Sequence, residues 1–283
     1  MTKNNLVAPV LKWVGGKRQL FETFKPLFPK KFSAYCEPFL GGGAVFFNLQ
    51  PRKAYINDIN KDLMLVYEVI RDDVESLIEI LSVFENESDF FYAVRDLDRD
   101  KEIFPQLSRV ERAARIIYLN KTCFNGLYRV NNAGEFNSPF GSYRNPNIVN
   151  APTLRAVNKY LNSAEIVLTA TDYADVLSEI PRNTFVYLDP PYAPVSTTAN
   201  FTGYTKGGFN QDEQIRLRDC CNELTERGIK FMLSNSDTEL IHELYNGYNY
   251  NIIQVKARRI VNSVASKRGD VNELVIMNYG KKR

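Results

Sequence analysis

The sequence has almost no histidine and no paired-cysteine motif. His242 is the only histidine in 283 residues, and the four cysteines, two of which are adjacent (Cys220 and Cys221), show no CxxC spacing. A lone histidine argues against a Ser-His-Asp hydrolase, and no set of metal ligands suggests itself, so we expect no metal. The cysteine pattern suits disulfides poorly and predicts reduced thiols in a cytoplasmic protein.

Long apolar runs are also missing. No stretch approaches the ~20 apolar residues that span a bilayer, and residues 1–9 lack the apolar centre of a signal peptide. The chain is 44% hydrophobic and 24% charged, as soluble globular proteins are. We therefore expect no membrane partner, and a core large enough for one domain or for one domain with an insertion.

Charge is unevenly distributed along the chain. Residues 68–105 carry four Lys/Arg and twelve Asp/Glu, whereas the whole chain has a net charge of +3. The remainder is therefore distinctly basic, with clusters around residues 12–18, 112–144 and 256–268. Clusters that converge on one face would form a phosphate-binding surface, and scattered ones an ordinary solvated surface. Charge alone leaves both interpretations open.

The pattern of apolar residues distinguishes strand-like runs, helical stretches and one hairpin-like segment. Short apolar runs typical of strands lie at 33–37, 53–58, 166–169, 185–188, 230–233, 251–255 and 273–277. Helical patterns occupy 44–49 and 211–227, and much of 61–119 has a 3.6-residue apolar period. Residues 122–147 are rich in Asn, Gly, Pro and aromatics, with a turn signal at 131–134 that predicts a hairpin. The simplest architecture is one α/β domain interrupted by a mostly helical insertion near 61–165.

The sharpest chemical signal is Asp189-Pro190-Pro191-Tyr192, which follows the apolar run 185–188. This segment would lie at the carboxyl end of a strand, where open α/β sheets bind ligands. Methylation of a planar amine needs acceptors for its two N–H groups, because they favour a tetrahedral nitrogen with an available lone pair. The Asp189 carboxylate and a stiff Pro190 carbonyl supply these acceptors, and Tyr192 offers a face for stacking. The plainer alternative is an acidic turn made rigid by its prolines.

A glycine-rich turn follows the first strand pattern. Glu37-Pro-Phe-Leu-Gly-Gly-Gly43 lets backbone approach a ligand, but it has no Walker A Lys-Ser/Thr and is not a clean GxGxxG. Asp58 ends the next strand, where a ribose-binding acid belongs, and a helix N-cap is its alternative role. Near the start, Gly15-Gly16-Lys17 suits either an anionic group or a surface turn, and Trp13 suits a core anchor.

These motifs and their order resemble the Dam-type DNA adenine methyltransferases (D12 class, α arrangement), whose target is GATC. The similarity runs from Lys12 to about Glu273 and is carried by short motifs in a fixed order. They are Lys-Trp-x-Gly-Gly-Lys at 12–17, Glu-Pro-Phe-x-Gly at 37–41, Asn-Asp-Ile-Asn at 57–60, Asn-Gly-Leu-Tyr-Arg at 125–129, Glu-Phe-Asn-x-Pro-Phe-Gly at 135–141, Asp-Pro-Pro-Tyr-Ala-Pro at 189–194, Ala-Asn-Phe-Thr at 199–202 and Leu-Ser-Asn-Ser-Asp at 233–237. Together they are far more specific than any single motif.

The resemblance implies a Rossmann-like, S-adenosylmethionine-dependent methyltransferase fold with a mostly helical inserted DNA-recognition domain that contains a hairpin. Residues 1–60 and 166–283 would form the catalytic domain, and 61–165 the recognition domain. Asp189, Pro190, Pro191 and Tyr192 would be catalytic and hold the flipped adenine. The cofactor-binding residues would be Trp13, Lys17, Glu37, Phe39, Gly41, Gly43, Asp58, Ile59, Asp172, Tyr173 and Asp189, with Asp58 on the ribose hydroxyls and Asp172 and Tyr173 at the cofactor's adenine.

The resemblance also implies which residues contact DNA. Arg129 would bind a guanine through two hydrogen bonds, Leu127 and Pro139 would contact a thymine methyl, and Lys12 would contact the outer guanine. Phe124 would enter the base stack. Further contacts would come from Lys121, Asn125, Asn131, Asn137 and Tyr143. For each residue, a structural role within the hairpin is the competing interpretation.

Two residues depart from the family pattern, and one further segment has a distinct composition. Ser142 stands where the family often has Arg, which puts a phosphate contact there in doubt. Phe124 replaces a more common Tyr, which keeps stacking but loses a hydroxyl. Residues 261–269 are polar and basic, as in a loop close to phosphate or a disordered segment.

The predicted function is methyl transfer from S-adenosylmethionine to adenine N6 in double-stranded DNA, by base flipping and direct in-line transfer. We expect a monomer with no obligate protein partner. One alternative is an amine methyltransferase that acts on RNA or on a protein glutamine, against which the aromatic, basic insert at 121–144 argues. A second is a catalytically silent DNA-binding regulator, against which the intact 189–192 segment argues.

Overall fold

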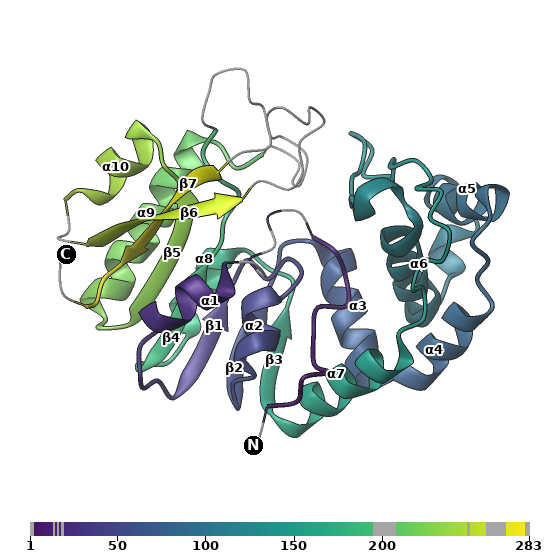
Figure 1. The fold of residues 1–283 in the computed structure, drawn as a ribbon, viewed down its shortest axis with the longest axis horizontal. Coiled ribbons are helices and arrows are strands. Elements are labelled where there is room, and N and C mark those ends of the chain that lie inside the picture. The colour runs from purple at the N-terminus through teal and green to yellow at the C-terminus, as the bar shows by residue number, and fades with distance from the viewer. Residues whose placement is uncertain are drawn as a thin grey trace. The chain divides into compact units, whose positions relative to one another are not determined.

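The computed structural model describes residues 3–13, 15, 17, 20–194, 208–247, 250–258 and 270–280. The motif at 199–202 and the basic segment at 261–269 lie outside these residues. The chain divides into two compact units, and Figure 1 labels their elements. Unit 1 comprises Met1–Arg18, Leu40–Arg52 and Asn57–Ala170, and unit 2 comprises Gln19–Phe39, Lys53–Ile56 and Thr171–Arg283.

Within the described residues, seven strands form one sheet in the order β3-β2-β1-β4-β5-β7-β6 (Figure 1). The strands are β1 (Ala34–Glu37), β2 (Lys53–Asn57), β3 (Glu165–Thr169), β4 (Thr184–Leu188), β5 (Lys230–Ser236), β6 (Asn251–Arg258) and β7 (Asp270–Met277). β1 pairs in parallel with β2 and β4, and β4 with β5, whereas β7 is antiparallel to both β5 and β6. The predicted α/β, Rossmann-like fold is confirmed.

The strand order reverses between β1 and β4, which are neighbours although β2 and β3 separate them in the sequence. In open α/β sheets, ligands bind at such a switch point, beyond the carboxyl ends of the parallel strands. Glu37 ends β1 and Asp189 follows β4. Both predicted site residues therefore stand at the edge of the sheet that this rule favours.

Helices lie in the ranges 44–49, 61–119 and 211–227, where the apolar periodicity predicts them, and further helices lie outside those ranges. Unit 1 contains α2 (Ala44–Leu49), α3 (Lys61–Asp72), α4 (Val74–Ser82), α5 (Ser88–Asp96), α6 (Arg109–Thr122) and α7 (Ala151–Ser163), and unit 2 contains α1 (Phe21–Phe24), α8 (Tyr173–Glu179), α9 (Gln211–Glu226) and α10 (Glu239–Tyr245). Gly228 follows α9 with φ of +70°, as expected of a C-cap glycine. Among the described residues, no helix is long and apolar enough to cross a membrane.

Strand β5 is longer than its apolar pattern. It continues past Leu233 through Ser234, Asn235 and Ser236, whose side chains are all buried. Polar side chains are tolerated inside a sheet when they are hydrogen-bonded, so a pattern built on apolar residues stops too early here. Leu188 of β4 lies opposite Leu233 in the parallel register, so the polar extension runs beside the segment that follows β4.

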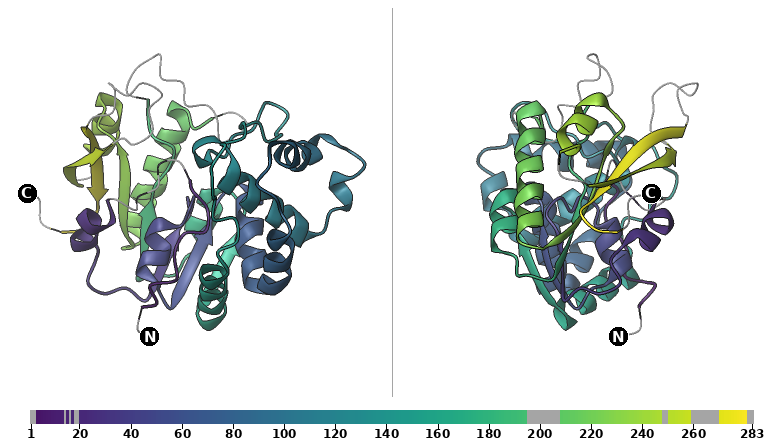
Figure 2. Two further views of the ribbon diagram at one scale, coloured as in Figure 1. Left: turned by 45° about the vertical axis from the view of Figure 1, so that its right-hand side comes forward. Right: turned by 90° about the vertical axis from the view of Figure 1, so that its left-hand side faces the viewer.

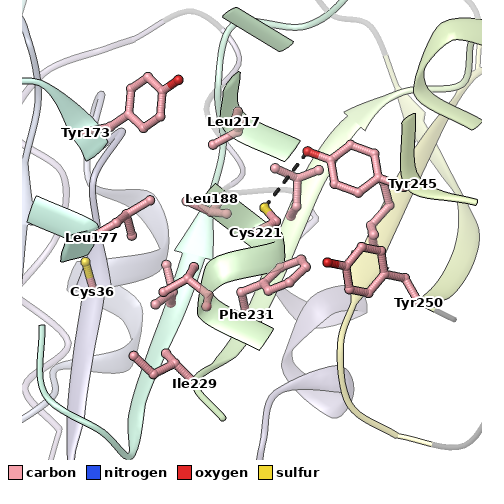
Figure 3. Packing of buried hydrophobic residues seen from close by; sticks show 14 of the residues in the cluster. Cys36, Tyr173, Leu177, Leu188, Leu217, Cys221, Ile229, Phe231, Tyr245 and Tyr250 are labelled. Carbon is pink, nitrogen blue, oxygen red and sulfur yellow. Dashed lines mark hydrogen bonds between the residues drawn. The ribbon is translucent and has the colours of Figure 1, made fainter. Parts of the chain in front are cut away.

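The two faces of β4 are both covered within unit 2. Tyr187 packs against Phe24, with ring centroids 6.3 Å apart. Phe24 belongs to α1, the short purple helix of Figure 2. On the opposite face, Leu188 belongs to an apolar core with Leu217 and Cys221 of α9 (Figure 3). Since burial on both faces fixes the strand, it also fixes the position from which the 189–192 segment starts.

Helix α6 leads into the predicted hairpin in unit 1. It begins with a capping box, in which Ser108 Oγ accepts the Glu111 N–H and the Glu111 carboxylate accepts the Ser108 N–H. It packs against α3, α4 and α5. After α6 the chain folds back on itself, with antiparallel bridges that join Cys123 to Phe140 and Val130 to Phe136. The predicted hairpin is therefore present, as isolated bridges rather than a regular ladder.

Candidate functional site

The predicted site residues fall into two groups, one in each unit. Unit 1 holds Lys12, Trp13, Lys17, Gly41, Gly43, Asp58, Ile59 and the whole set predicted to contact DNA. Unit 2 holds Glu37, Phe39, Asp172, Tyr173 and the segment 189–192.

Asp58 is held by two backbone amides. Its Oδ2 accepts the Gly41 N–H and its Oδ1 the Asn60 N–H, both at 2.9 Å. Asn60, not Asp58, caps α3 by accepting the Leu63 N–H at 3.0 Å, so the N-cap role considered for Asp58 is wrong. Burial raises the pKa of Asp58, and the two amides oppose that rise. The next residue, Ile59, is 50% exposed, so an accessible apolar side chain follows the Asp58 carboxylate in the chain.

Trp13 lies against the glycine turn that precedes α2. A Cβ added to Gly41, whose φ is +50°, would come within 2.9 Å of Trp13 Cδ1, so the indole requires a glycine there. The indole also stacks on Tyr128. Lys17 is only 5% exposed, and its ammonium donates to a carbonyl within the same short segment. Trp13 is half-buried, so it packs on its neighbours without belonging to the fully buried core.

Three aromatic residues cluster in unit 2, one after β1, one at the start of α8 and one before α9. The rings of Phe39 and Tyr173 lie 5.0 Å apart, and Phe209 lies 5.9 Å and 6.1 Å from them. Asp172 caps α8, and Arg216 binds both of its carboxylate oxygens, at 2.7 and 2.9 Å, while covering the Tyr173 ring. Planar aromatic faces beside a fixed carboxylate suit a flat heteroaromatic ring.

Glu37 is a buried carboxylate at the end of β1. It is 2% exposed and accepts the Tyr35 hydroxyl at 2.6 Å. Burial and the Glu37 charge raise the pKa of Tyr35 well above its usual value, so the phenol remains a hydrogen-bond donor.

The 189–192 segment is anchored to β7 through its tyrosine. Tyr192 donates its hydroxyl to Glu273 Oε2 at 2.8 Å. Burial and the Asp189 and Glu273 carboxylates raise the pKa of Tyr192 far above its usual value, which keeps the phenol neutral. A neutral, anchored ring presents a fixed face on which a planar base can stack.

The backbone next to Tyr192 is held by residues that the sequence did not single out as functional. Asn235 Oδ1 accepts the Ala193 N–H at 3.1 Å, and Ser236 Oγ donates to the Ala193 carbonyl at 2.7 Å. Both side chains belong to the polar extension of β5. The only sequence signal was the Leu-Ser-Asn-Ser-Asp motif at 233–237, which carried resemblance without an assigned role.

The hairpin presents an exposed aromatic side chain. Phe124 is 54% exposed, and the two residues after it turn the chain sharply, with φ of +58° at Asn125 and +64° at Gly126. A single exposed phenylalanine is ordinary on a protein surface, and its ring here is accessible to a partner. The hairpin-core role considered for Phe124 does not fit this exposure.

Arg129 is exposed and oriented by its partner in the hairpin. Its Nε donates to Asn137 Oδ1 at 2.7 Å, and its Nη2 to the Asn137 carbonyl at 3.1 Å. Three of its five N–H groups remain on the outer end of the guanidinium. Asn131 closes the turn, since its Oδ1 accepts the N–H groups of Ala133 and Glu135.

Asn120 ties the N-terminal segment to the hairpin. It is fully buried, accepts the Lys12 N–H at 2.8 Å, and donates to the carbonyls of Lys12 and Gly126 at 2.8 and 3.2 Å. The Lys12 ammonium lies 5.3 Å above the Tyr143 ring. Burial and the neighbouring Lys12 lower the pKa of Lys121. The predicted DNA contacts Lys12, Lys121 and Tyr143 are thus close together, and sequence reasoning missed the Asn120 side chain that supports them.

Residues 13–261 match the family described as D12 class N6 adenine-specific DNA methyltransferase. The chain is 43% identical over 283 residues to Type II methyltransferase M1.LlaDCHI of Lactococcus lactis subsp. cremoris, covering 99% of both chains. It is 44% identical to Type II methyltransferase M.MjaIII of Methanocaldococcus jannaschii, covering 96% of this chain and 99% of that one. It is 34% identical to the DNA adenine methylase of Escherichia coli (strain K12), covering 94% of each.

Proposed function

Because the chain belongs to the D12 class of N6 adenine-specific DNA methyltransferases, we propose that it methylates the adenine of GATC in duplex DNA with S-adenosylmethionine as donor. The target adenine is flipped out of the helix, and transfer is direct and in line. The observation that carries the proposal is the Asp-Pro-Pro-Tyr segment, which follows β4 at the reversal of strand order and is anchored by Tyr192. Other segments supply the binding functions, with residues 61–165 as the recognition domain and 1–60 and 166–283 as the catalytic domain.

Catalysis at an exocyclic amine depends on drawing its lone pair out of the ring. Asp189 accepts one N–H of the adenine amine and the Pro190 carbonyl accepts the other, which favours a tetrahedral, nucleophilic nitrogen. Tyr192 supports the base from its face. S-adenosylmethionine supplies an electrophilic methyl group when bound. The protein thus contributes positioned acceptors and a stacking face, and needs no side chain as a covalent intermediate.

The residues of unit 1 fit the ribose of S-adenosylmethionine. Each oxygen of the Asp58 carboxylate has one backbone donor, and a carboxylate oxygen can accept two hydrogen bonds. The free acceptor positions match two adjacent hydroxyl groups. In unit 2, Phe39 and Tyr173 offer aromatic faces to the adenine ring. The other members of the proposed cofactor-binding set are Trp13, Lys17, Glu37, Gly41, Gly43, Ile59, Asp172 and Asp189.

Base flipping needs a side chain to occupy the vacated position, because unstacking costs a few kcal/mol. The exposed ring of Phe124 is suited to that role. Arg129, held by Asn137, directs two N–H groups outward as recognition of guanine O6 and N7 requires. Leu127 and Pro139 are the proposed contacts to the thymine methyl, and Lys12 to the outer guanine.

The recognition sequence is tested by measuring kcat/KM on a GATC duplex and on duplexes in which each base pair of the site is replaced in turn. GATC specificity predicts a loss of at least tenfold at every position, since one lost base contact is worth ~1–3 kcal/mol. Equal rates on a different adenine-containing site would reject GATC while leaving adenine methylation intact.

A further inference from the structure

The loop after β4 is held by a chain of two buried amide side chains. Gln214 of α9 donates its Nε2 to the Pro191 carbonyl at 2.9 Å. Asn235 of β5 donates its Nδ2 to Gln214 Oε1 at 3.0 Å. Both side chains are almost completely buried, at 1% and 0% exposure. Buried amides that bond to each other and to backbone keep one arrangement, because an unpaired alternative costs the desolvation of a polar group.

The direction of every hydrogen bond in this chain is determined. Asn235 Oδ1 accepts the backbone N–H groups of Ala193 and Ser236, at 3.1 and 2.8 Å, and a backbone N–H can only donate. Asn235 Nδ2 must therefore face Gln214 Oε1, which turns Gln214 Nε2 toward the carbonyl of Pro191. A flip of either amide would place donors against donors. The two backbone donors thus orient both amides.

Prolines make this support necessary. Pro190 and Pro191 have no N–H, so the only backbone group through which Pro191 can be held is its carbonyl. Gln214 supplies the donor for that carbonyl, and Asn235 holds the N–H of Ala193, two residues further along the chain. Tyr192 lies between these two fixed points.

We propose that Gln214 and Asn235 are positioning residues for the methyl transfer, acting through the Pro191 carbonyl on the Asp189–Tyr192 segment. This rests on the proposed function, since it assigns them to the same reaction. Neither residue touches the substrate. Their contribution is to kcat, because a displaced catalytic segment misaligns acceptors whose geometry controls the rate.

The decisive variant is Gln214→Glu, which is nearly isosteric. When ionised, its carboxylate can accept from Asn235 but cannot donate to the Pro191 carbonyl. When protonated, it regains the donor. The quantity to measure is the ratio of the variant's kcat to the wild-type kcat as a function of pH. We expect this ratio to fall as pH rises through the pKa of the introduced carboxyl group. Once that group is ionised, the variant's kcat should be roughly 10²-fold below that of the wild type. The Kd values for DNA and S-adenosylmethionine should change by less than about twofold.

The matched control is Gln211→Glu, the same change on the exposed first residue of α9. Its kcat ratio should not vary with pH. Asn235→Asp is an independent variant, because it keeps the acceptor for the two backbone N–H groups and loses the donor to Gln214. It should show a pH-dependent loss of kcat of the same sign as Gln214→Glu.

Two results would overturn the proposal. One is a kcat ratio for Gln214→Glu that is independent of pH and matches the Gln211→Glu control. The other is a loss confined to Kd, with kcat unchanged. The wild-type enzyme distinguishes these failures from failure of the proposed function, because wild type that transfers no methyl group to DNA adenine rejects the function before any variant is compared.

Discussion

Trp13 and Tyr128 stack face to face, with ring centroids 5.0 Å apart and planes inclined by 25°. Trp13 belongs to the segment predicted to bind the cofactor, and Tyr128 to the hairpin predicted to read DNA. The Tyr128 hydroxyl donates to Asp62 Oδ2 at 3.0 Å, which holds its ring in place. The indole is thus placed between the hairpin and the glycine turn at Gly41.

Removing this stack should weaken cofactor binding without direct contact to the cofactor. Aromatic pairs contribute ~0.5–1.5 kcal/mol, so Tyr128→Ala is expected to raise the Kd for S-adenosylmethionine by roughly two- to twelvefold, measured by titration calorimetry. Tyr128→Phe keeps the ring and loses the bond to Asp62. It should bind nearly as the wild type does, and equal losses in both variants would mean that the hydroxyl, not the stack, positions Trp13.

Cofactor affinity should depend on pH through Asp58. Its pKa is raised by burial, and the ionised form is the better acceptor for ribose hydroxyls. Affinity is therefore fully present above this raised pKa and is lost as pH falls through it. Asp58→Asn should bind roughly 10- to 150-fold more weakly at neutral pH, as expected when a hydrogen bond to a charged group is lost. The Kd of this variant should not change with pH over the same pH range. If the wild-type Kd is equally independent of pH, Asp58 does not bind the ribose.

Arg129 should determine discrimination at one guanine. Arg129→Lys keeps the charge but loses the paired N–H groups that Asn137 orients. We expect kcat/KM on GATC to fall. The further loss of kcat/KM on replacing that guanine with another base should be smaller than in the wild type, by ~1–3 kcal/mol. A uniform loss on all sequences, with a reduced salt dependence of binding, would make Arg129 a phosphate contact instead.

Phe124→Ala should impair base extrusion more than chemistry. Single-turnover methylation of a fully paired GATC duplex is expected to slow, whereas a duplex with a mismatch opposite the target adenine should be methylated at nearly the wild-type rate, because its base leaves the stack more easily. Val83→Ala, at another exposed apolar residue of unit 1, is the control. Equal slowing on paired and mismatched duplexes would contradict the wedge role.

Local patterns predicted much of this fold, because strands and helices follow apolar periodicity. The apolar runs at 185–188 and 230–233 correspond to β4 and β5, and 44–49 to α2. Asp58 could be placed at a strand end, since that position is set by the preceding residues alone.

The supporting polar residues could not be predicted in the same way. In the sequence, Gln214 is indistinguishable from any other polar residue of a helix. Its hydrogen-bond partner Asn235 is 21 residues away and belongs to another element. Asn120 meets Lys12 across 108 residues. Such pairs arise only when tertiary packing buries the groups together, and single-sequence patterns carry no information on that packing.

The most direct test is tritiated methyl transfer from S-adenosylmethionine to two matched duplexes. One contains GATC, and in the other the same adenine is N6-methyladenine on both strands. The account predicts incorporation into the first duplex alone, at one methyl group per target adenine. Equal incorporation into both duplexes, or none into either, would contradict it.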